Sequence, residues 1–279
     1  MNEIWLLDGD RVLRRAPTSG PSRLTNERLA LTRASDAGLP APRPLDWGQD
    51  KDGRDWLLVE QMPGTPLIDL WPDLPRAKQL DLAAQAGVML ARLHEVETGG
   101  HGLLNEQEAT GGFASWQNFL ADCLDRWSKP SLACGFLQPN QLERLQSIMP
   151  ILTSAASQAN GAQRMVHSDY HLENVLSDGE TITAIIDFEW CYGGDPMQDF
   201  HIEPRNSWVV QGSHPAMTEG YYTHAPDPGP LAHERRWLNR ALLAIEQAPD
   251  QIARGDKQGH AESIALLFGA LMVLEPLID

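Results

Sequence analysis

The densest group of reactive side chains in this sequence is the stretch HSDYHLEN, residues 167–174. Within it, Asn174 follows Asp169 by five residues, and Asp187 comes thirteen residues later, directly after two isoleucines. A short hairpin between these segments would bring the three oxygen-bearing side chains together at loop ends. Magnesium prefers one or two carboxylates completed by water and phosphate oxygens. The spacing therefore predicts a magnesium and phosphate site with one aspartate left to orient or deprotonate a hydroxyl, as phosphoryl transfer requires.

The same stretch allows a second chemistry, because two histidines four residues apart on a helix can bind zinc. His167 and His171 have this spacing. The motif is not H-E-x-x-H, however, and the continuation LENV at residues 172–175 is more typical of a loop that enters a strand. Without a helix the two imidazoles need not converge, so the sequence favours magnesium over a zinc hydrolase site.

The composition is that of a soluble globular protein with enough apolar residues for a substantial core. The chain has 279 residues, of which 42% are hydrophobic and 22% are charged. With 38 acidic against 22 basic residues, the formal charge is −16. Such a chain repels nucleic acid and anionic membranes at long range, so we expect neither as a partner. A neutral or cationic small molecule fits the charge better.

Neither the cysteines nor the apolar segments indicate export or membrane insertion. Cys123, Cys134 and Cys191 form no CxxC pair and cannot all be bridged, which is typical of a reducing compartment. No stretch is expected to approach the roughly 20 apolar residues of a membrane span. The sequence therefore predicts a cytoplasmic protein.

The patterns divide the chain into a small sheet-containing part and a larger helical part. Two strands at residues 4–7 and 11–15 flank the turn Asp-Gly-Asp, a hairpin signature. A helix is predicted from residue 25 to Gly38, and further strands at 44–47 and 56–61. Beyond Gly64, three- and four-residue apolar spacing predicts the helices, which we expect after Pro75 and at 113–127, 138–156, 231–248 and 258–275. One strand region is predicted at 164–167, 175–176 and 181–186.

Four segments together carry a family resemblance. They are HSDYHLEN (167–174), IIDFEWCYGGDPMQDF (185–200), the helix LARLHEV (90–96) and the segment LLVEQMPG (57–64). In this order and spacing, they resemble the aminoglycoside phosphotransferase and choline kinase-like family. The resemblance implies an α+β, two-lobed protein-kinase-like fold, with a nucleotide-binding lobe at residues 1–63 and a helical lobe at 64–279 that bears the catalytic loop and the acceptor site. It implies transfer of the γ-phosphoryl group of ATP, or of GTP, to a small hydroxyl acceptor with Mg²⁺.

The resemblance also assigns roles to residues around the nucleotide. Asp169 would be the base that accepts the proton of the acceptor hydroxyl. Asn174 and Asp187 would hold Mg²⁺ against the β- and γ-phosphates. Backbone groups of Glu60 and Met62 would face the adenine at the junction between the lobes.

Three further residues are expected to support the catalytic loop. His167 matches a position that braces the loop, and Asp199 matches an aspartate at the start of a helix that hydrogen-bonds the loop backbone. Asp195 is expected to cap that helix. His94, on an apolar helical face, is expected to be a satisfied core histidine without a chemical role.

The cation of the small lobe departs from the family pattern. Relatives usually have a lysine that touches the α- and β-phosphates and pairs with a glutamate on the first helix. Here the matching residue is Arg14, with Glu27 as its natural partner. An arginine keeps the charge but presents a planar fork, so its contact geometry must differ. Glu27 is equally compatible with a simple favourable charge at a helix amino terminus.

Family members have a further strand and a small-residue loop ahead of the hairpin, and this loop covers the nucleotide phosphates. The present sequence begins at Met1, in what would be the middle of this strand-and-loop unit. Either the start is placed too late, or half of the unit that covers the phosphates is lacking. In the second case we expect weaker ATP binding and an unpaired sheet edge. A catalytically weak or inert pseudokinase is the alternative that follows, against which the intact Asp169, Asn174 and Asp187 argue.

The acceptor is expected against the helices of the large lobe, at residues 105–160 and 203–275. The acidic balance favours a cationic acceptor such as an aminoglycoside or an amino alcohol. Glu203 is one candidate contact. Several aromatic residues either line this site or belong to the core: Trp116, Trp127, Trp208, Trp237, Tyr221 and Tyr222.

Overall fold

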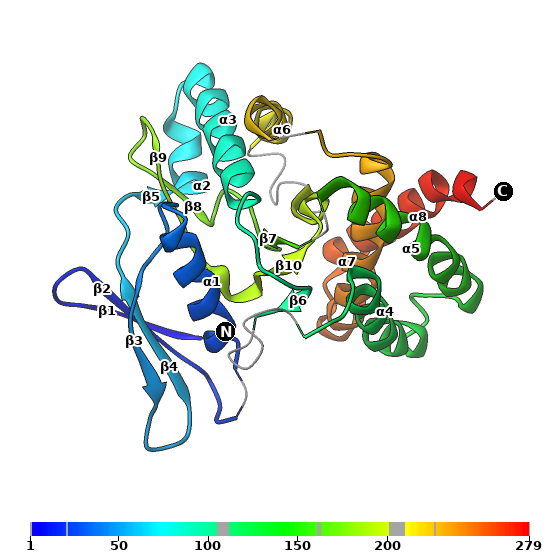
Figure 1. Cartoon of the computed structure of the whole chain (residues 1–279), viewed down its shortest axis with the longest axis horizontal. Coiled ribbons are helices and arrows are strands. Elements are labelled where there is room, and N and C mark those ends of the chain that lie inside the picture. The colour runs from blue at the N-terminus through cyan, green and yellow to red at the C-terminus, as the bar shows by residue number, and fades with distance from the viewer. Residues whose placement is uncertain are drawn as a thin grey trace.

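The computed structural model describes residues 2–20, 22–104, 112–160, 163–200, 210–225 and 227–278. A small sheet with one helix lies at one end, and the larger, mostly helical part lies at the other (Figure 1). Short strands and the segment 167–200 lie between them. The predicted α+β organisation is therefore confirmed.

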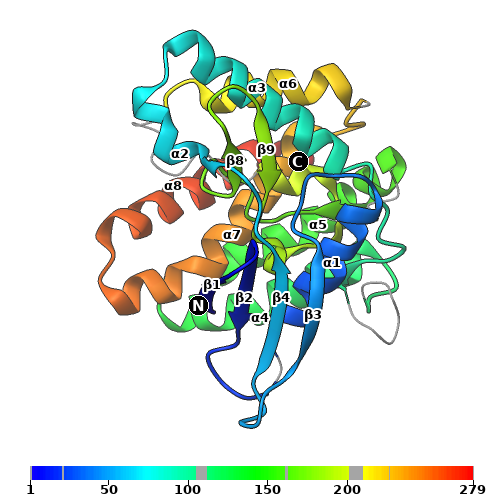
Figure 2. The same ribbon diagram turned by 90° about the vertical axis from the view of Figure 1, so that its left-hand side faces the viewer.

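The small sheet has four antiparallel strands in the order β1-β2-β4-β3, which run side by side in Figure 2. The predicted hairpin consists of β1 (Glu3–Leu7) and β2 (Arg11–Arg15). The three residues between these strands form the turn, in which Gly9 has φ 81° and Asp10 has φ 56°, left-handed values that glycine and aspartate tolerate better than most residues. β3 (Pro44–Gln49) and β4 (Asp55–Glu60) form the other predicted strands, two residues longer and one residue earlier than expected.

Helix α1 (Leu24–Asp36) covers one face of this sheet. Leu57 and Val59 of β4 are buried in the same core as Leu31, whereas Leu58 between them is only partly buried, as strand alternation demands. Arg14 of β2 pairs directly with Leu57. Directly opposed residues share a face, so the register turns Arg14 toward α1.

Among the described residues, the larger part contains six helices of 12 to 23 residues and several shorter ones. Their bounds are α2 (Leu67–Leu70), η1 (Trp71–Asp73), α3 (Arg76–Leu93), α4 (Trp116–Ala133), α5 (Pro139–Asn160), α6 (Ser213–His224), α7 (Ala232–Arg254), α8 (Lys257–Leu274) and η4 (Glu275–Leu277). The sequence did not predict α6. It also ended α4 and α7 too early, because both continue through a proline, at Pro130 and Pro249. Each proline lies within the last two turns of its helix and removes one hydrogen bond, the one that its missing N–H would make to the residue four positions earlier.

Helix α8 corrects the expectation that no segment is long and apolar enough to span a membrane. By length and composition, Lys257–Leu277 meets that condition, with a mean hydropathy of 1.4 over its best window, of which 22% is buried. In the structure α8 packs along α7 through Leu267, Ala270 and Leu274 (Figure 1). Its opposite face carries exposed Phe268 and Met272.

The predicted central strand region is split between two sheets. β7 (Arg164–Val166) joins the sheet β6-β10-β7, whereas β8 (Val175–Ser177) and β9 (Ile182–Ile185) join β5-β8-β9. The unpredicted partners are very short: β5 (Thr65–Pro66), β6 (Gly102–Leu103) and β10 (Tyr192–Gly194). Residues 167–174 therefore cross from one sheet to the other.

Candidate active site

Asp199 anchors the beginning of the segment 167–174, which we call the catalytic loop. Its Oδ2 accepts the backbone N–H of His167 at 2.8 Å, and its Oδ1 accepts that of Ser168 at 2.6 Å. Ser168 has φ 68°, a left-handed conformation that is uncommon for a residue with a side chain. The two hydrogen bonds hold the backbone in this conformation immediately before Asp169. Asp199 itself lies in the 3₁₀ turn η3 (Pro196–Phe200).

His94 supports Asp199 from the end of helix α3. Its Nε2 lies 2.9 Å from Asp199 Oδ2, and its Nδ1 lies 2.9 Å from the Tyr221 hydroxyl on α6. Burial alone would raise the pKa of Asp199, but hydrogen bonding and charge from His94, together with the loop amides, lower it overall. His94 is thus the satisfied core histidine that was predicted, and it links α3 and α6 to the loop.

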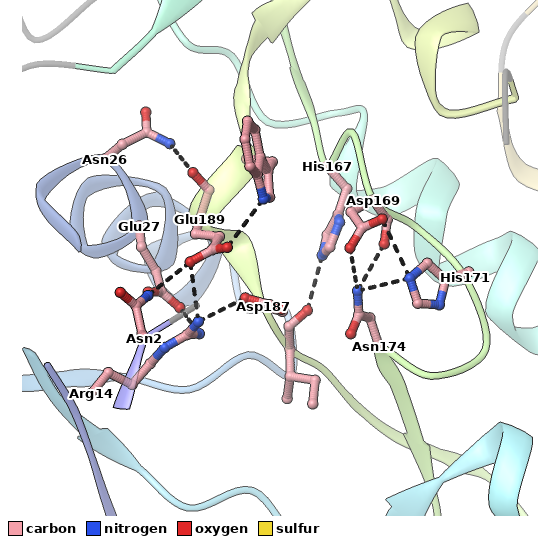
Figure 3. Close-up of polar contacts among 12 residues, drawn as sticks. Asn2, Arg14, Asn26, Glu27, His167, Asp169, His171, Asn174, Asp187 and Glu189 are labelled. Carbon is pink, nitrogen blue, oxygen red and sulfur yellow. Dashed lines mark hydrogen bonds and ion pairs between the residues drawn. The ribbon is translucent and has the colours of Figure 1, made fainter. Parts of the chain in front are cut away.

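Asp169 and Asn174 are in direct contact. Asn174 Nδ2 donates to the backbone oxygen of Asp169 at 2.9 Å and to its Oδ2 at 3.2 Å. The amide oxygen of Asn174 therefore lies on the side away from Asp169, as Figure 3 shows. His171 lies beside both residues, with Nε2 3.3 Å from Asp169 Oδ1 and 3.4 Å from Asn174 Nδ2.

Asp187 follows β9 and is tied to the catalytic loop through the backbone. The N–H of Ile186 donates to the carbonyl oxygen of Asn174 at 2.9 Å. Asp187 then takes φ 66°, which ends the strand sharply. In Figure 3 its carboxylate points toward Arg14 rather than toward Asn174, and Oδ1 lies 2.9 Å from Arg14 Nη2.

Arg14 is surrounded by three carboxylates. Its Nη1 contacts Glu27, and its Nη2 contacts both Asp187 and, at 3.4 Å, Glu189. Burial would lower the pKa of Arg14, but the three acids outweigh it and raise that pKa. Burial raises the pKa of Glu27 to about 8, against the opposing effect of Arg14 and with help from Asp187 and Glu189. One guanidinium is thus shared by three acidic groups, of which the buried Glu27, with its raised pKa, keeps most of its proton at neutral pH.

Sequence reasoning missed Glu189. It accepts a hydrogen bond from the Asn2 side chain at 2.8 Å, and its backbone oxygen accepts one from Asn26 at 3.0 Å. Glu189 thereby joins the residue before β1, helix α1 and the segment after Asp187 (Figure 3). The available signal was a second acid two residues after Asp187.

His167 and Asp195 lie outside the immediate cluster of Asp169, Asn174 and Asp187. The His167 ring is buried, which lowers its pKa, and its Nε2 donates to the Ile186 carbonyl at 3.0 Å. Asp195 Oδ1 accepts the Met197 N–H at 3.1 Å, as a cap does. Its Oδ2 also forms a buried ion pair with Arg235 Nε at 3.0 Å, which was not predicted. Burial raises the pKa of Asp195 despite Arg235.

A hollow of about 460 Å³ opens at the junction between the two parts of the molecule. Its lining includes Glu60 and Met62, together with Gly9, Asp10, Arg11, Leu45, Gln61 and Pro63. The Glu60 amide is already bonded to the Arg43 carbonyl oxygen at 3.0 Å. Arg11 is an odd number of residues from Arg14, so its side chain projects from the opposite face of the sheet. The hollow is therefore beside the junction backbone and separate from the Arg14 cluster.

The donor atoms present fit a magnesium ion better than zinc. Within the described ranges, no three histidine, cysteine or acidic residues are placed to hold a metal. The two histidines of the loop have different neighbours: His167 donates to the Ile186 carbonyl, whereas His171 lies beside Asp169 and Asn174. A carboxylate on Asp187 and an amide oxygen on Asn174 are hard ligands that water and phosphate oxygens would complete.

Of the aromatic residues predicted either to line the acceptor site or to belong to the core, most belong to the core or pack against it, and one is exposed. Trp116 and Tyr221 are core residues, and Trp127 and Trp237 pack against the core. Tyr222 is exposed and contacts Phe200 and Arg236. Glu203 and Trp208 lie outside the described residues.

Comparison with known proteins adds an independent line of evidence. Residues 2–237 match the sequence profile described as the phosphotransferase enzyme family. The hygromycin-B 4-O-kinase of Escherichia coli is 25% identical over 181 residues, which are 61% of this chain and 48% of that protein. A homoserine kinase of Rhodopseudomonas palustris is 23% identical over 184 residues, 66% of this chain and 52% of that protein. The chain spans about half the length of these two relatives.

Solved structures share the fold. Aminoglycoside phosphotransferase APH(4)-Ia, in a thermostable mutant without ligand, superposes with a TM-score of 0.68 at 17% identity, over 97% of this chain and 89% of that one. A ternary complex of a further variant of that enzyme with ADP and hygromycin B gives 0.67 at 15% identity, over 98% and 93%. The GDP complex of aminoglycoside 2'-phosphotransferase-IIIa gives 0.62 at 17% identity, over 96% and 88%. These likenesses confirm the two-lobed protein-kinase-like fold.

Proposed function

Because this chain belongs to the phosphotransferase enzyme family, we propose that it is a small-molecule kinase. It transfers the γ-phosphoryl group of ATP, or of GTP, to a hydroxyl of a small acceptor. The observation that carries the proposal is the contact of Asp169 with Asn174, on a loop whose backbone is bonded to the residue before Asp187. The two carboxylates and the amide are the groups that phosphoryl transfer needs for positioning and charge neutralisation.

Asp169 acts as the base in this proposal. Its carboxylate accepts the proton of the acceptor hydroxyl while the hydroxyl oxygen forms a bond to the γ-phosphorus. The bond from the γ-phosphorus to the β,γ-bridging oxygen breaks, and the nucleoside diphosphate leaves with that oxygen. Asp199 contributes indirectly, because it holds the backbone from which Asp169 projects.

Asn174 and Asp187 would hold Mg²⁺, and Arg14 would bind the nucleotide phosphates. When bound, Mg²⁺ would neutralise charge on the β- and γ-phosphates. Arg14 is bonded to Asp187 in the present structure, so nucleotide phosphates would share this cation with the aspartate. Glu27 and Glu189 keep the guanidinium in place, and the backbone of Glu60 and Met62 faces the adenine.

The acceptor proposed is a small cationic alcohol, such as an aminoglycoside or an amino alcohol. Relatives named for hygromycin B and for homoserine support a hydroxyl acceptor. The charge of −16 favours a cation. We further propose that the nucleotide lobe comprises residues 1–63 and the acceptor lobe residues 64–279, and that the protein acts in the cytoplasm.

Nucleotide binding and transfer can be tested separately. At a hundred times the dissociation constant, a ligand stabilises the folded state by about 2.7 kcal/mol, which should raise the melting temperature by roughly 5–10 °C. We expect this shift with ATP and Mg²⁺, a much smaller one for Asp187→Ala, and an unchanged one for Asp169→Asn. Phosphorylated product from a panel of hydroxyl compounds, read by mass spectrometry, should form with the wild type and not with Asp169→Asn.

The inert pseudokinase is the competing outcome of this experiment. A wild-type protein that binds ATP but phosphorylates no acceptor would favour it, and so would the absence of a shift at any nucleotide concentration. Unimpaired turnover in Asp169→Asn would remove the role proposed for that residue.

A further inference from the structure

His171 is a buried histidine in contact with both Asp169 and Asn174. Its Nε2 lies 3.3 Å from Asp169 Oδ1 and 3.4 Å from Asn174 Nδ2. Its Nδ1 lies 3.3 Å from the backbone nitrogen of Glu173. The residue is 7% exposed, so protein groups rather than bulk water set the environment of the ring. Figure 3 shows the ring at the side of Asp169 that faces away from His167.

The Glu173 contact decides which ring nitrogen carries the hydrogen. A neutral imidazole has one donor and one acceptor nitrogen, and the hydrogen bond made by one fixes the role of the other. Because Nδ1 accepts the Glu173 N–H, the hydrogen is on Nε2. The Glu173 carboxylate, 3.7 Å from Nδ1, is too far away to compete as a hydrogen-bond acceptor.

This tautomer places an N–H group beside each carboxylate oxygen of Asp169. Asn174 Nδ2 donates to Oδ2, and His171 Nε2, which carries its hydrogen, lies 3.3 Å from Oδ1. The two donors approach from different residues of one loop, so together they restrict rotation of the carboxylate. That rotation is otherwise broad, since the terminal torsion of an aspartate has no narrow minimum.

We infer that His171 is a positioning residue that orients the Asp169 carboxylate toward the acceptor hydroxyl. The inference rests on the proposed function and specifies how its base is held. A base is effective only within hydrogen-bond reach of the proton that it removes, and neighbours that lock its orientation provide this geometry. His171 therefore acts through Asp169, without contact to the reacting atoms.

Two amide substitutions separate this role from a packing role. A glutamine at 171 can present its Nε2 near the position of the imidazole Nε2, whereas the shorter asparagine reaches only the position of Nδ1. We expect His171→Asn and His171→Ala to lower kcat roughly 10–100-fold, the range known for side chains that orient a metal ligand. His171→Gln should retain most of kcat, and KM for ATP should stay the same in all three.

The result that overturns the inference is equal loss of kcat in His171→Gln and His171→Asn, or a loss that follows melting temperature across the variants. A second measurement does not depend on turnover. Nitrogen-15 NMR of the imidazoles, with the His171 signals assigned from their loss in His171→Gln, should show hydrogen on Nε2 in the wild type. Hydrogen on Nδ1 would contradict the inference. If the wild type neither binds ATP nor phosphorylates any acceptor, the proposed function itself fails, whereas hydrogen on Nδ1 in a protein that does phosphorylate an acceptor overturns only the role of His171.

Discussion

At the scale of single residues, the central feature is that one guanidinium, that of Arg14, contacts three acidic side chains. Its two terminal nitrogens reach Glu27 on one side and Asp187 with Glu189 on the other. A planar fork can serve acids on two sides at once, whereas a lysine ammonium is a point charge on a flexible stem. Arginine at this position is therefore suited to hold three acids rather than one.

Replacing Arg14 by lysine tests this geometry. We expect Arg14→Lys to lower the free energy of unfolding by about 1.5–3 kcal/mol, the value of one hydrogen bond to a charged group. Urea unfolding at neutral pH measures it. Arg43→Lys is the matched control, because its pair with Glu60 is exposed and such pairs contribute about 1 kcal/mol or less. An equal loss of unfolding free energy in Arg14→Lys and Arg43→Lys would contradict the view that Arg14 is needed to contact several acids at once.

Glu27 should make folding stability depend on pH. Its pKa is about 8 in the folded protein against 4.5 for the unperturbed group, so between these values the folded state binds more protons than the unfolded state. The contribution of Glu27 is fully present below about pH 4.5 and is lost as the pH rises through 8. Unfolding free energy measured from pH 5 to 8 should fall less steeply in Glu27→Gln than in the wild type. An unchanged slope would show that another group is responsible.

At the scale of elements, the catalytic loop depends on the packing of α3 against α6. A Cβ on Gly220 of α6 would meet the carbonyl oxygen of Ala84 on α3, and one on Gly87 would meet that of Met217. The two glycines thus allow the helix backbones to touch. This approach brings the Tyr221 hydroxyl to His94, which in turn holds Asp199 and the loop.

Gly220→Ala should therefore destabilise the protein and disturb the loop. We expect a loss of about 1–3 kcal/mol, typical of an added methyl group in a packed interface. Glu219→Ala, at the exposed neighbouring position on the same helix, is the control and should change the unfolding free energy by less than about 0.5 kcal/mol. Similar values for both variants would mean that the helices separate without cost.

At the scale of the whole molecule, the net charge should affect how readily a charged acceptor binds. A chain of charge −16 attracts cations from a distance, and salt screens this attraction over about 10 Å at 0.1 M. The effect belongs to the summed field rather than to any one residue. It also distinguishes a cationic acceptor from a neutral one.

Ionic strength provides the measurement. For a cationic acceptor, we expect KM to rise as sodium chloride increases from about 20 to about 300 mM, roughly several-fold, with kcat little changed. A neutral hydroxyl acceptor of the same enzyme serves as the control and should show a flat KM. A rise for both acceptors would point to the nucleotide or the metal instead.

The sequence by itself determined the local devices. The hairpin turn at Gly9 and Asp10, the helix that begins near residue 25 and the spacing of Asp169, Asn174 and Asp187 depend on residues that are close along the chain. Such patterns can be read without knowledge of the fold. Even the element ends were right to within a few residues in the small lobe, where glycine and proline mark them.

The tertiary structure alone decided which distant groups meet. The strands β5, β6 and β10 exist only because remote partners complete their hydrogen bonds. Each has only two or three residues, which is too short for a sequence pattern that would predict a strand. The contacts of Arg14 with Asp187 and Glu189, of His94 with Asp199 and Tyr221, and of Arg235 with Asp195 join segments between 40 and 175 residues apart. Contacts of this kind follow from how the two lobes and their helices pack, because burial forces charged and polar groups to find partners wherever the fold places them.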